Sequence, residues 1–326
     1  MKMVEVQNVS KKYGDATAVN KLSFSVPRGE ILGFLGPNGA GKTTTMRIIT
    51  GFLPPTSGSV RVDGIDVLES PLETKKRIGY LPENSPLYPE MTVAHFLSFM
   101  AEMKGLDPKT ISREVDHVVE QLELGPVYHR LTGNCSLGYR HRIGLGQALL
   151  GDPPILILDE PTSGLDPRQR IEIRDLIRSL AGERTVILSS HVLSEVQQTC
   201  ERVVIINKGE LVAEDSPSGL AARLQGHSSL QTEIRGPREQ IIALLGEIAG
   251  IDTINVDSEN ERSTIFSLEV SPERDVREDI FHAMAAHNCP ILEITSHRAS
   301  LEDVFLQLTT EDPTSTLAAG EEDADE

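Results

Sequence analysis

Short runs of apolar residues alternate with segments of helical periodicity along the first two thirds of the chain. Three of the runs have the aliphatic pattern of central strands that are buried on both faces of a sheet. They cover residues 31–35, 155–158 and 185–189. Each is followed by polar or glycine-rich residues and then by a helix-like segment, at residues 42–50, 168–180 and 192–199. The pattern predicts an α/β fold with a largely parallel sheet, in which ligands bind beyond the carboxyl ends of the strands.

A long helical stretch interrupts this alternation. Residues 93–122 are mostly helical in pattern, with a break at Gly105, Asp107 and Pro108. We therefore expect an inserted helical subdomain at about residues 85–150, within a first domain of residues 1–225.

The pattern changes after Pro217, where a short helix (218–224) and a polar joint (225–229) precede a second unit. Apolar spacing in this unit predicts strands at 230–234, 253–256, 264–270 and 291–296, and helices at 238–248 and 277–287. The order β-α-β-β-α-β indicates a small ferredoxin-like α+β domain over residues 230–309, ending in a helix at 301–308.

Composition is that of an ordinary globular protein of two domains. The chain has 326 residues, of which 39% are hydrophobic and 25% charged. Its apolar runs are far shorter than the ~18 residues that cross a bilayer, and its N-terminus has no pattern of a secretory signal. We expect a cytoplasmic location. Three widely spaced cysteines, Cys135, Cys200 and Cys289, predict neither disulfides nor a paired-cysteine metal site, so we expect core residues.

The net charge of −18 disfavours nucleic acid as a partner, because such binding depends on Lys and Arg neutralising phosphates. Seven acids and no base lie in residues 311–326, which leaves 42 acids and 31 bases, or −11, for residues 1–310. The composition predicts a disordered acidic tail at residues 310–326.

Between the first central strand and its helix, the chain matches the phosphate-loop pattern. Its glycines let backbone N–H groups wrap phosphate oxygens, and the helix that follows adds its positive N-terminal end. Lys42 is expected to reach the β- and γ-phosphates, and Thr43 to offer a hydroxyl to Mg²⁺. The predicted nucleotide-binding residues of this segment are Gly36, Pro37, Asn38, Gly39, Ala40, Gly41, Lys42, Thr43 and Thr44.

The second central strand ends in two adjacent carboxylates, Asp159 and Glu160. Side chains alternate along a strand, so the two acids should do different work. Asp159 is expected to hold Mg²⁺ through its water shell, as a strand-end Asp does in other phosphate-loop NTPases. Glu160 then remains to orient or deprotonate the attacking water.

The order of these motifs resembles that of the ATP-binding subunit of an ATP-binding-cassette (ABC) transporter, over residues 1 to about 225. Residues 163–166, Ser-Gly-Leu-Asp, follow the acidic strand end as that family's D-loop does, and His191 follows the third central strand as its switch histidine does. The resemblance implies that His191 contacts the γ-phosphate and is catalytic with Glu160, and that Tyr13 stacks on adenine.

The signature segment departs from the family's LSGGQ pattern. Residues 135–140 read Cys-Ser-Leu-Gly-Tyr-Arg and retain Ser136 and Gly138, which can bind a γ-phosphate through a hydroxyl, a backbone N–H and the N-terminus of a helix predicted at 139–150. In the family this segment serves the ATP of the opposite subunit, so the resemblance implies a head-to-tail homodimer. The residues themselves leave a second arrangement open, in which Ser136 returns to the ATP of its own chain.

Glu83 stands where the family usually has the glutamine of its Q-loop. A carboxylate can still ligate Mg²⁺, since hard cations prefer oxygen, but it adds negative charge beside the phosphates. Both departures, together with Leu-Glu-Asp-Val-Phe-Leu-Gln-Leu-Thr at residues 301–309, resemble the ABC-2-like exporter branch, which includes drug-resistance and gliding-motility-associated systems.

The resemblance implies an ATPase subunit that binds MgATP in a homodimer, closes on ATP and reopens on hydrolysis, driving a separate integral membrane subunit from the cytoplasmic face of the membrane. Two alternatives remain. One is a soluble ATPase of the same superfamily that acts on ribosomes or DNA, although the chain has one phosphate loop and no sustained heptads. The other is a nucleotide-sensing interaction protein without turnover, which Glu160 and His191 argue against.

Overall fold

The chain divides into two units, Met1–Pro217 and Ser218–Glu326. The computed structural model describes residues 2–182, 184–223, 228–260, 262–271 and 274–297. The predicted helix at 301–308 and the acidic tail at 310–326 lie outside these described residues. Within them, no helix combines the length and the apolarity needed to span a bilayer.

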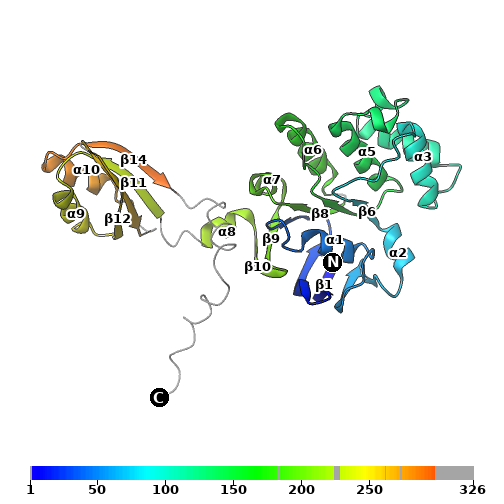
Figure 1. Cartoon of the computed structure of the whole chain (residues 1–326), viewed down its shortest axis with the longest axis horizontal. Coiled ribbons are helices and arrows are strands. Elements are labelled where there is room, and N and C mark those ends of the chain that lie inside the picture. Colours follow the sequence, from blue (N-terminus) through cyan, green and yellow to red (C-terminus); the bar gives the residue numbers. More distant parts are fainter. Residues whose placement is uncertain (1, 183, 224–227, 261, 272–273, 298–326) are drawn as a thin grey trace, which may run out of the picture. The chain divides into compact units, whose positions relative to one another are not determined.

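A six-stranded central sheet organises the first unit, with the order β10-β9-β3-β8-β7-β6. Figure 1 labels four of its strands, β6, β8, β9 and β10. Its strands are β3 (Ile31–Leu35), β6 (Ile78–Leu81), β7 (Ile155–Asp159), β8 (Thr185–Ser190), β9 (Arg202–Asn207) and β10 (Glu210–Asp215). All pairs are parallel except β9 with β10. The three predicted central strands, β3, β7 and β8, are confirmed and are buried along their whole length, as expected where both faces are covered.

The strand order places the predicted site residues at the carboxyl ends of three adjacent strands. Because β3, β8 and β7 are parallel neighbours, their carboxyl ends meet on the same side of the sheet. The segments that follow them carry the phosphate loop, His191 and the acids Asp159 and Glu160 respectively. The fold therefore brings the phosphate loop together with two segments that follow it by more than a hundred residues in sequence.

A second, antiparallel sheet in the same unit has the order β2-β1-β4-β5. Its strands are β1 (Lys2–Tyr13), β2 (Ala16–Pro27), β4 (Ser57–Val62) and β5 (Ile65–Asp66). The apolar pattern had predicted one largely parallel sheet, and this second sheet is an addition to it. Its inward side chains, such as Val4, Val6 and Val62, join residues of the central sheet in one hydrophobic core.

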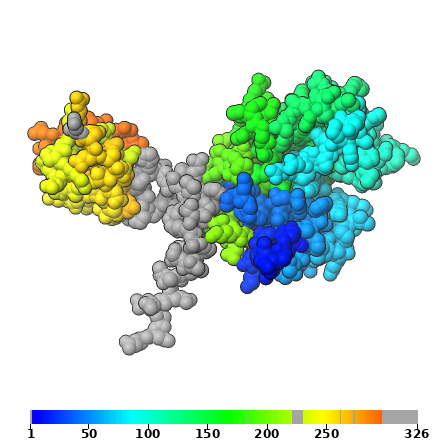
Figure 2. Space-filling model, viewed as in Figure 1, coloured from blue at the N-terminus to red at the C-terminus, as the bar shows by residue number. Residues whose placement is uncertain are grey.

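Helices cover both sheets. They are α1 (Lys42–Ile49), α2 (Pro71–Lys76), α3 (Val93–Met103), α4 (Ile111–Gln121), α5 (Leu137–Leu149), α6 (Pro167–Leu180) and α7 (Leu193–Thr199), with 3₁₀ turns at Gly125–Val127 and Thr132–Asn134. Helix α1 packs between the sheets, and α7 packs on β3 and β8. Helices α3 and α5 lie side by side, in cyan and green in Figure 2, and with α4 they form the helical insertion between β6 and β7.

The second unit has the element order β-α-β-β-α-β and an antiparallel sheet ordered β12-β13-β11-β14. After helix α8 (Pro217–Arg223), these elements are β11 (Ser228–Ile234), α9 (Arg238–Gly246), β12 (Ile251–Glu259), β13 (Thr264–Val270), α10 (Arg277–Ala286) and β14 (Ile291–His297). Phe266 and Leu268 of the sheet pack with Ile241, Ile280 and Met284 of the two helices. This unit therefore has a hydrophobic core of its own.

Several predicted boundaries in this region are shifted; the helix predicted at 238–248, for example, ends at Gly246. The polar joint at 225–229 is shorter, because Ser228 and Ser229 already pair with β13, and backbone ladders need no apolar side chain. The strand at 253–256 is longer, because β12 stays paired with β13 from Ile251 to Glu259. The prediction that the cysteines are core residues is confirmed, since Cys135, Cys200 and Cys289 are all buried.

Candidate nucleotide site

The phosphate loop is built around Lys42, the first residue of α1. Its Nζ donates to the Gly36 carbonyl at 2.8 Å and the Pro37 carbonyl at 3.3 Å, so the loop wraps the lysine side chain. Gly41, which caps the helix, has φ +102°, and a Cβ there would lie 2.5 Å from the Ala18 carbonyl oxygen. Glycine is needed at this position so that the loop can turn into the helix with its N–H groups facing outward.

Asp159 is the last residue of β7 and is almost completely buried. Its Oδ1 accepts a hydrogen bond from the Ser189 hydroxyl at 2.6 Å. Its Oδ2 is buried and finds no hydrogen-bond partner among the described residues. An unpaired buried carboxylate oxygen is costly, and it suits a hard cation or the water shell of one.

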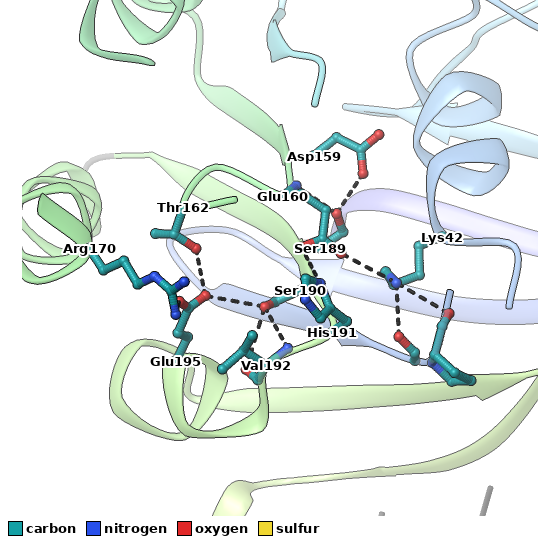
Figure 3. A network of polar contacts seen from close by, with 12 residues as sticks. Lys42, Asp159, Glu160, Thr162, Arg170, Ser189, Ser190, His191, Val192 and Glu195 are labelled. Carbon is teal, nitrogen blue, oxygen red and sulfur yellow. Dashed lines mark hydrogen bonds and ion pairs between the residues drawn. The ribbon is translucent and has the colours of Figure 1, made fainter. Parts of the chain in front are cut away.

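Glu160 lies between two cationic or potentially cationic side chains (Figure 3). Its Oε1 is 3.3 Å from Lys42 Nζ, and its Oε2 is 2.9 Å from His191 Nδ1. The backbone of Glu160 has φ +50°, a left-handed conformation, and its N–H donates to the Ser189 hydroxyl at 2.9 Å. Such conformations persist where the surroundings hold them, and they are frequent at functional sites.

These side chains face a hollow of about 420 Å³. The hollow is lined by Ala18, Asn38, Gly39, Gly41, Lys42, Thr43, Thr44, Glu83, Glu160, Ser163 and His191. Nine predicted site residues thus lie together, and Gly36 and Pro37 stand behind them as acceptors for Lys42. Ala40 is buried in the core. A loop of backbone donors with one lysine and one carboxylate can bind a polyphosphate and activate water beside it.

The donors present fit one Mg²⁺ ion held mainly by waters and phosphates. The Thr43 hydroxyl and the Glu83 carboxylate line the hollow, and the free Oδ2 of Asp159 lies at the end of the neighbouring strand. Clusters of three or more His, Cys, Asp or Glu able to hold a metal are absent from the described part of the chain.

Tyr13 ends β1 and is half exposed, with Lys11 Nζ 5.3 Å from its ring centroid. It does not belong to the lining of the Lys42 hollow that the described residues provide. Lys11 thus uses the ring as a cation–π acceptor.

Ser136 and Gly138 line a different hollow, of about 440 Å³, together with Gln169 and Arg142. Ser136 caps α5 by accepting the Tyr139 N–H at 3.4 Å, and a Cβ on Gly138 would lie 2.9 Å from Gln169 Cδ. In a single chain, the structure does not bring Ser136 into the hollow of Lys42.

Sequence reasoning missed several residues of the site. Ser189 joins both acids, and Ala18 and Ser163 line the hollow. Ser163 is the first residue of the segment that resembles the family's D-loop, although that resemblance gave it no role at the nucleotide. Ala18 and Ser189 carry no local signal, because they enter the site only through the pairing of strands.

Comparisons with known proteins agree with this geometry. The protein-family model described as "ABC transporter" matches residues 19–163, and one described as "AAA domain, putative AbiEii toxin, Type IV TA system" matches residues 141–196. The linearmycin resistance ATP-binding protein LnrL of Bacillus subtilis is 32% identical over 94% of this chain and 98% of its own length. The bacitracin transport ATP-binding protein BcrA of Bacillus licheniformis is 33% identical over 94% and 97%.

Solved structures of ATP-binding cassettes are also similar. One is the ATP-binding subunit of an ABC transporter, with TM-score 0.61 and 27% identity over 68% of this chain and 93% of that one. Another is a dimeric cassette in a post-hydrolysis state bound to ADP and Pi, with TM-score 0.60 and 25% identity over 66% of this chain and 98% of that one.

Proposed function

The chain belongs to the ATP-binding subunits of ABC transporters, and we propose that two copies form a head-to-tail homodimer that binds MgATP at two shared sites. It is an ATPase. One observation carries the proposed dimer: Ser136 and Gly138 lie in a different hollow from Lys42. A phosphate held by Lys42 can meet a serine and glycine of this segment only if a second copy supplies them.

In the proposed reaction, Lys42 exchanges partners. Its Nζ now pairs with Glu160 at 3.3 Å and would turn to the β- and γ-phosphates when ATP enters. Glu160 is then released from its pair with Lys42 and can orient or deprotonate water. His191 stays within 2.9 Å of the Glu160 carboxylate and can contact the γ-phosphate from the same side.

We assign Thr43, Asp159 and Glu83 to the Mg²⁺ ion. When bound, the ion would neutralise charge on the phosphate oxygens during transfer to water. The free Oδ2 of Asp159 supports the assignment, because nothing else among the described residues satisfies it. Ser189 holds the other oxygen of that carboxylate and so fixes its orientation.

We further propose that ATP binding and hydrolysis drive export, or another membrane process, through a separate integral membrane subunit at the cytoplasmic face. Relatives named for linearmycin resistance and bacitracin transport support this branch of the family. They favour a transporter over a soluble ATPase that acts on ribosomes or DNA, and over a sensor without turnover.

Affinity purification of the tagged chain from detergent-solubilised native membranes tests this function. We expect one integral membrane protein to co-purify and the ATPase rate to rise with it. The Lys42→Ala variant is the matched control, since it should retain the partner without the stimulated rate. Recovery of ribosomes or DNA in place of a membrane protein would contradict the proposal.

A further inference from the structure

Another carboxylate, Glu195 on α7, lies to one side of Glu160 and His191 (Figure 3). Its Oε2 accepts a hydrogen bond from the Thr162 hydroxyl at 2.5 Å and another from the Ser190 hydroxyl at 3.3 Å. Both hydroxyl-bearing residues are buried, and the Glu195 side chain is 18% exposed. One carboxylate thus collects two buried hydroxyl donors from different strand ends.

The two donors stand next to the catalytic residues in sequence. Thr162 lies two residues after Glu160, and Ser190 immediately precedes His191. The segments that they belong to meet again on the other side, where Glu160 Oε2 is 2.9 Å from His191 Nδ1. Glu195 and the Glu160–His191 pair therefore link the same two chain segments at two points. We call these contacts of Thr162, Glu195, Ser190, His191 and Glu160 the ring.

A third contact extends the ring to helix α6. Arg170 Nη1 is 3.7 Å from Glu195 Oε1, and Arg170 Nε donates to the Leu165 carbonyl at 2.9 Å. Leu165 belongs to the loop that also places Ser163 in the nucleotide hollow. Through Arg170, the position of this loop is linked to the same carboxylate.

Glu195 does not belong to the described lining of the nucleotide hollow. It lines another hollow, of about 270 Å³, between α6 and α7. It is therefore placed to act on the reacting atoms only through Glu160 and His191.

We propose that Glu195 is a positioning residue for ATP hydrolysis: it holds the segments that carry Glu160 and His191 at the spacing that the chemistry requires. The proposal rests on the catalytic assignment of Glu160 and His191 made above. Without the carboxylate, the buried Thr162 hydroxyl loses its acceptor and the Ser190 hydroxyl keeps the Val192 carbonyl at 3.4 Å, so the two segments are no longer tied to each other through Glu195. A displacement of about 1 Å at a reacting group can cost roughly 100-fold in rate.

The test compares kcat, KM for ATP and nucleotide affinity in full-length variants. Glu195→Ala should lower kcat by roughly 10- to 100-fold with KM and affinity within about twofold of the original chain. Glu195→Gln keeps an oxygen acceptor for the hydroxyls but loses the charge facing Arg170, so it should recover part of kcat. Thr162→Val removes one donor and should give a smaller loss than Glu195→Ala.

Val196→Ala is the control for stability, because Val196 is fully buried on the same helix and makes no contact in the ring. It should lower the unfolding temperature while kcat stays near its original value. Equal kcat losses in Val196→Ala and Glu195→Ala would overturn the proposal, since α7 packing alone would then explain the effect.

The double variant Glu160→Gln/Glu195→Ala distinguishes a failure of the positioning proposal from a failure of the catalytic assignment of Glu160. If Glu195 acts through Glu160, the double variant should hydrolyse ATP no more than about threefold slower than Glu160→Gln alone. Fully additive losses would refute the positioning role. Normal hydrolysis by Glu160→Gln alone would instead refute the catalytic assignment.

Discussion

Two surfaces of this chain could contact a nucleotide phosphate, the phosphate-loop surface around Lys42 and the signature surface around Ser136. They differ in the burial and the charge of their side chains. On the phosphate-loop surface, Lys42 and Glu160 are buried and paired with each other, and Glu160 also faces His191. On the signature surface, Ser136 is exposed and its hydroxyl serves only the cap of α5, and Gly138 packs under Gln169. The first surface holds a buried Lys–Glu pair. The second offers a serine hydroxyl at a helix N-terminus, beside an Arg142 that is already paired with Glu123 and Glu172.

The difference predicts that a phosphate has to replace different partners at the two surfaces. Removing one member of a buried ion pair costs about 3–5 kcal/mol, so the phosphate-loop surface can open only when phosphate replaces the lost partner. The signature surface loses only water from a hydroxyl and backbone N–H groups, which a phosphate oxygen restores. The first surface is thus suited to sense ATP within one chain, and the second to be brought up by another copy.

Lys42→Ala should have the largest effect. It removes the cation that faces two phosphates, and it leaves the buried Glu160 carboxylate without that partner. We expect ATP affinity to fall by at least about 100-fold, since charge-assisted hydrogen bonds contribute about 1.5–3 kcal/mol each. Titration with a fluorescent nucleotide measures the loss, and Lys75→Ala, an exposed lysine on α2, is the control. Unchanged affinity and turnover would remove Lys42 from the site.

Glu160→Gln should separate binding from chemistry on the same surface. The substitution keeps size and hydrogen bonding but removes the proton acceptor. Turnover should fall by about 10²- to 10⁴-fold, the usual contribution of a positioned general base, while ATP still binds. Phosphate release measures the rate, with exposed Glu102→Gln as the control. Near-normal hydrolysis would show that the carboxylate does not take part in the chemical step.

Ser136→Arg tests whether the second surface comes from another copy. In the Glu160→Gln background, unhydrolysed ATP should hold two copies together, and light scattering after size-exclusion chromatography should show an ATP-dependent dimer. The arginine should return the protein to monomer by filling the space next to Ser136. Ser112→Arg, on an exposed face of α4, should leave the dimer intact. A dimer that survives Ser136→Arg would contradict the shared site.

The smallest expected effect concerns His141, which joins α5 to the Glu160 segment. Its Nδ1 lies 2.9 Å from the Pro161 carbonyl oxygen, and burial lowers its pKa below the ordinary value of about 6.5. The unfolded chain then binds more protons than the folded chain just below that value. The free energy of unfolding should therefore decrease as the pH falls through this range, by at most about 1.4 kcal/mol per pH unit.

Urea unfolding of the first unit, followed by circular dichroism at pH 7.5 and 5.5, measures this dependence. His141→Gln keeps a donor for the Pro161 carbonyl and should flatten the pH dependence, whereas exposed His95→Gln should not. The same slope in His141→Gln and the original chain would exclude His141 as its source.

The sequence by itself determined the parts of this protein whose signal is local. The three buried strands, the glycines and lysine of the phosphate loop and the paired acids all follow from short stretches in which residue type, spacing and neighbouring periodicity agree. The last predicted helix and the acidic tail stay predictions, since they lie outside the described residues.

Only the tertiary structure decided which side chains meet. Strand order β3-β8-β7 brings Lys42 to Glu160, puts Ser189 between the two acids and lets Glu195 reach Thr162. It also decided that Ser136 lies apart from Lys42 in its own chain. These contacts join residues that are distant in sequence, and their geometry depends on strand pairing and helix packing, which the periodicity of a short segment does not encode.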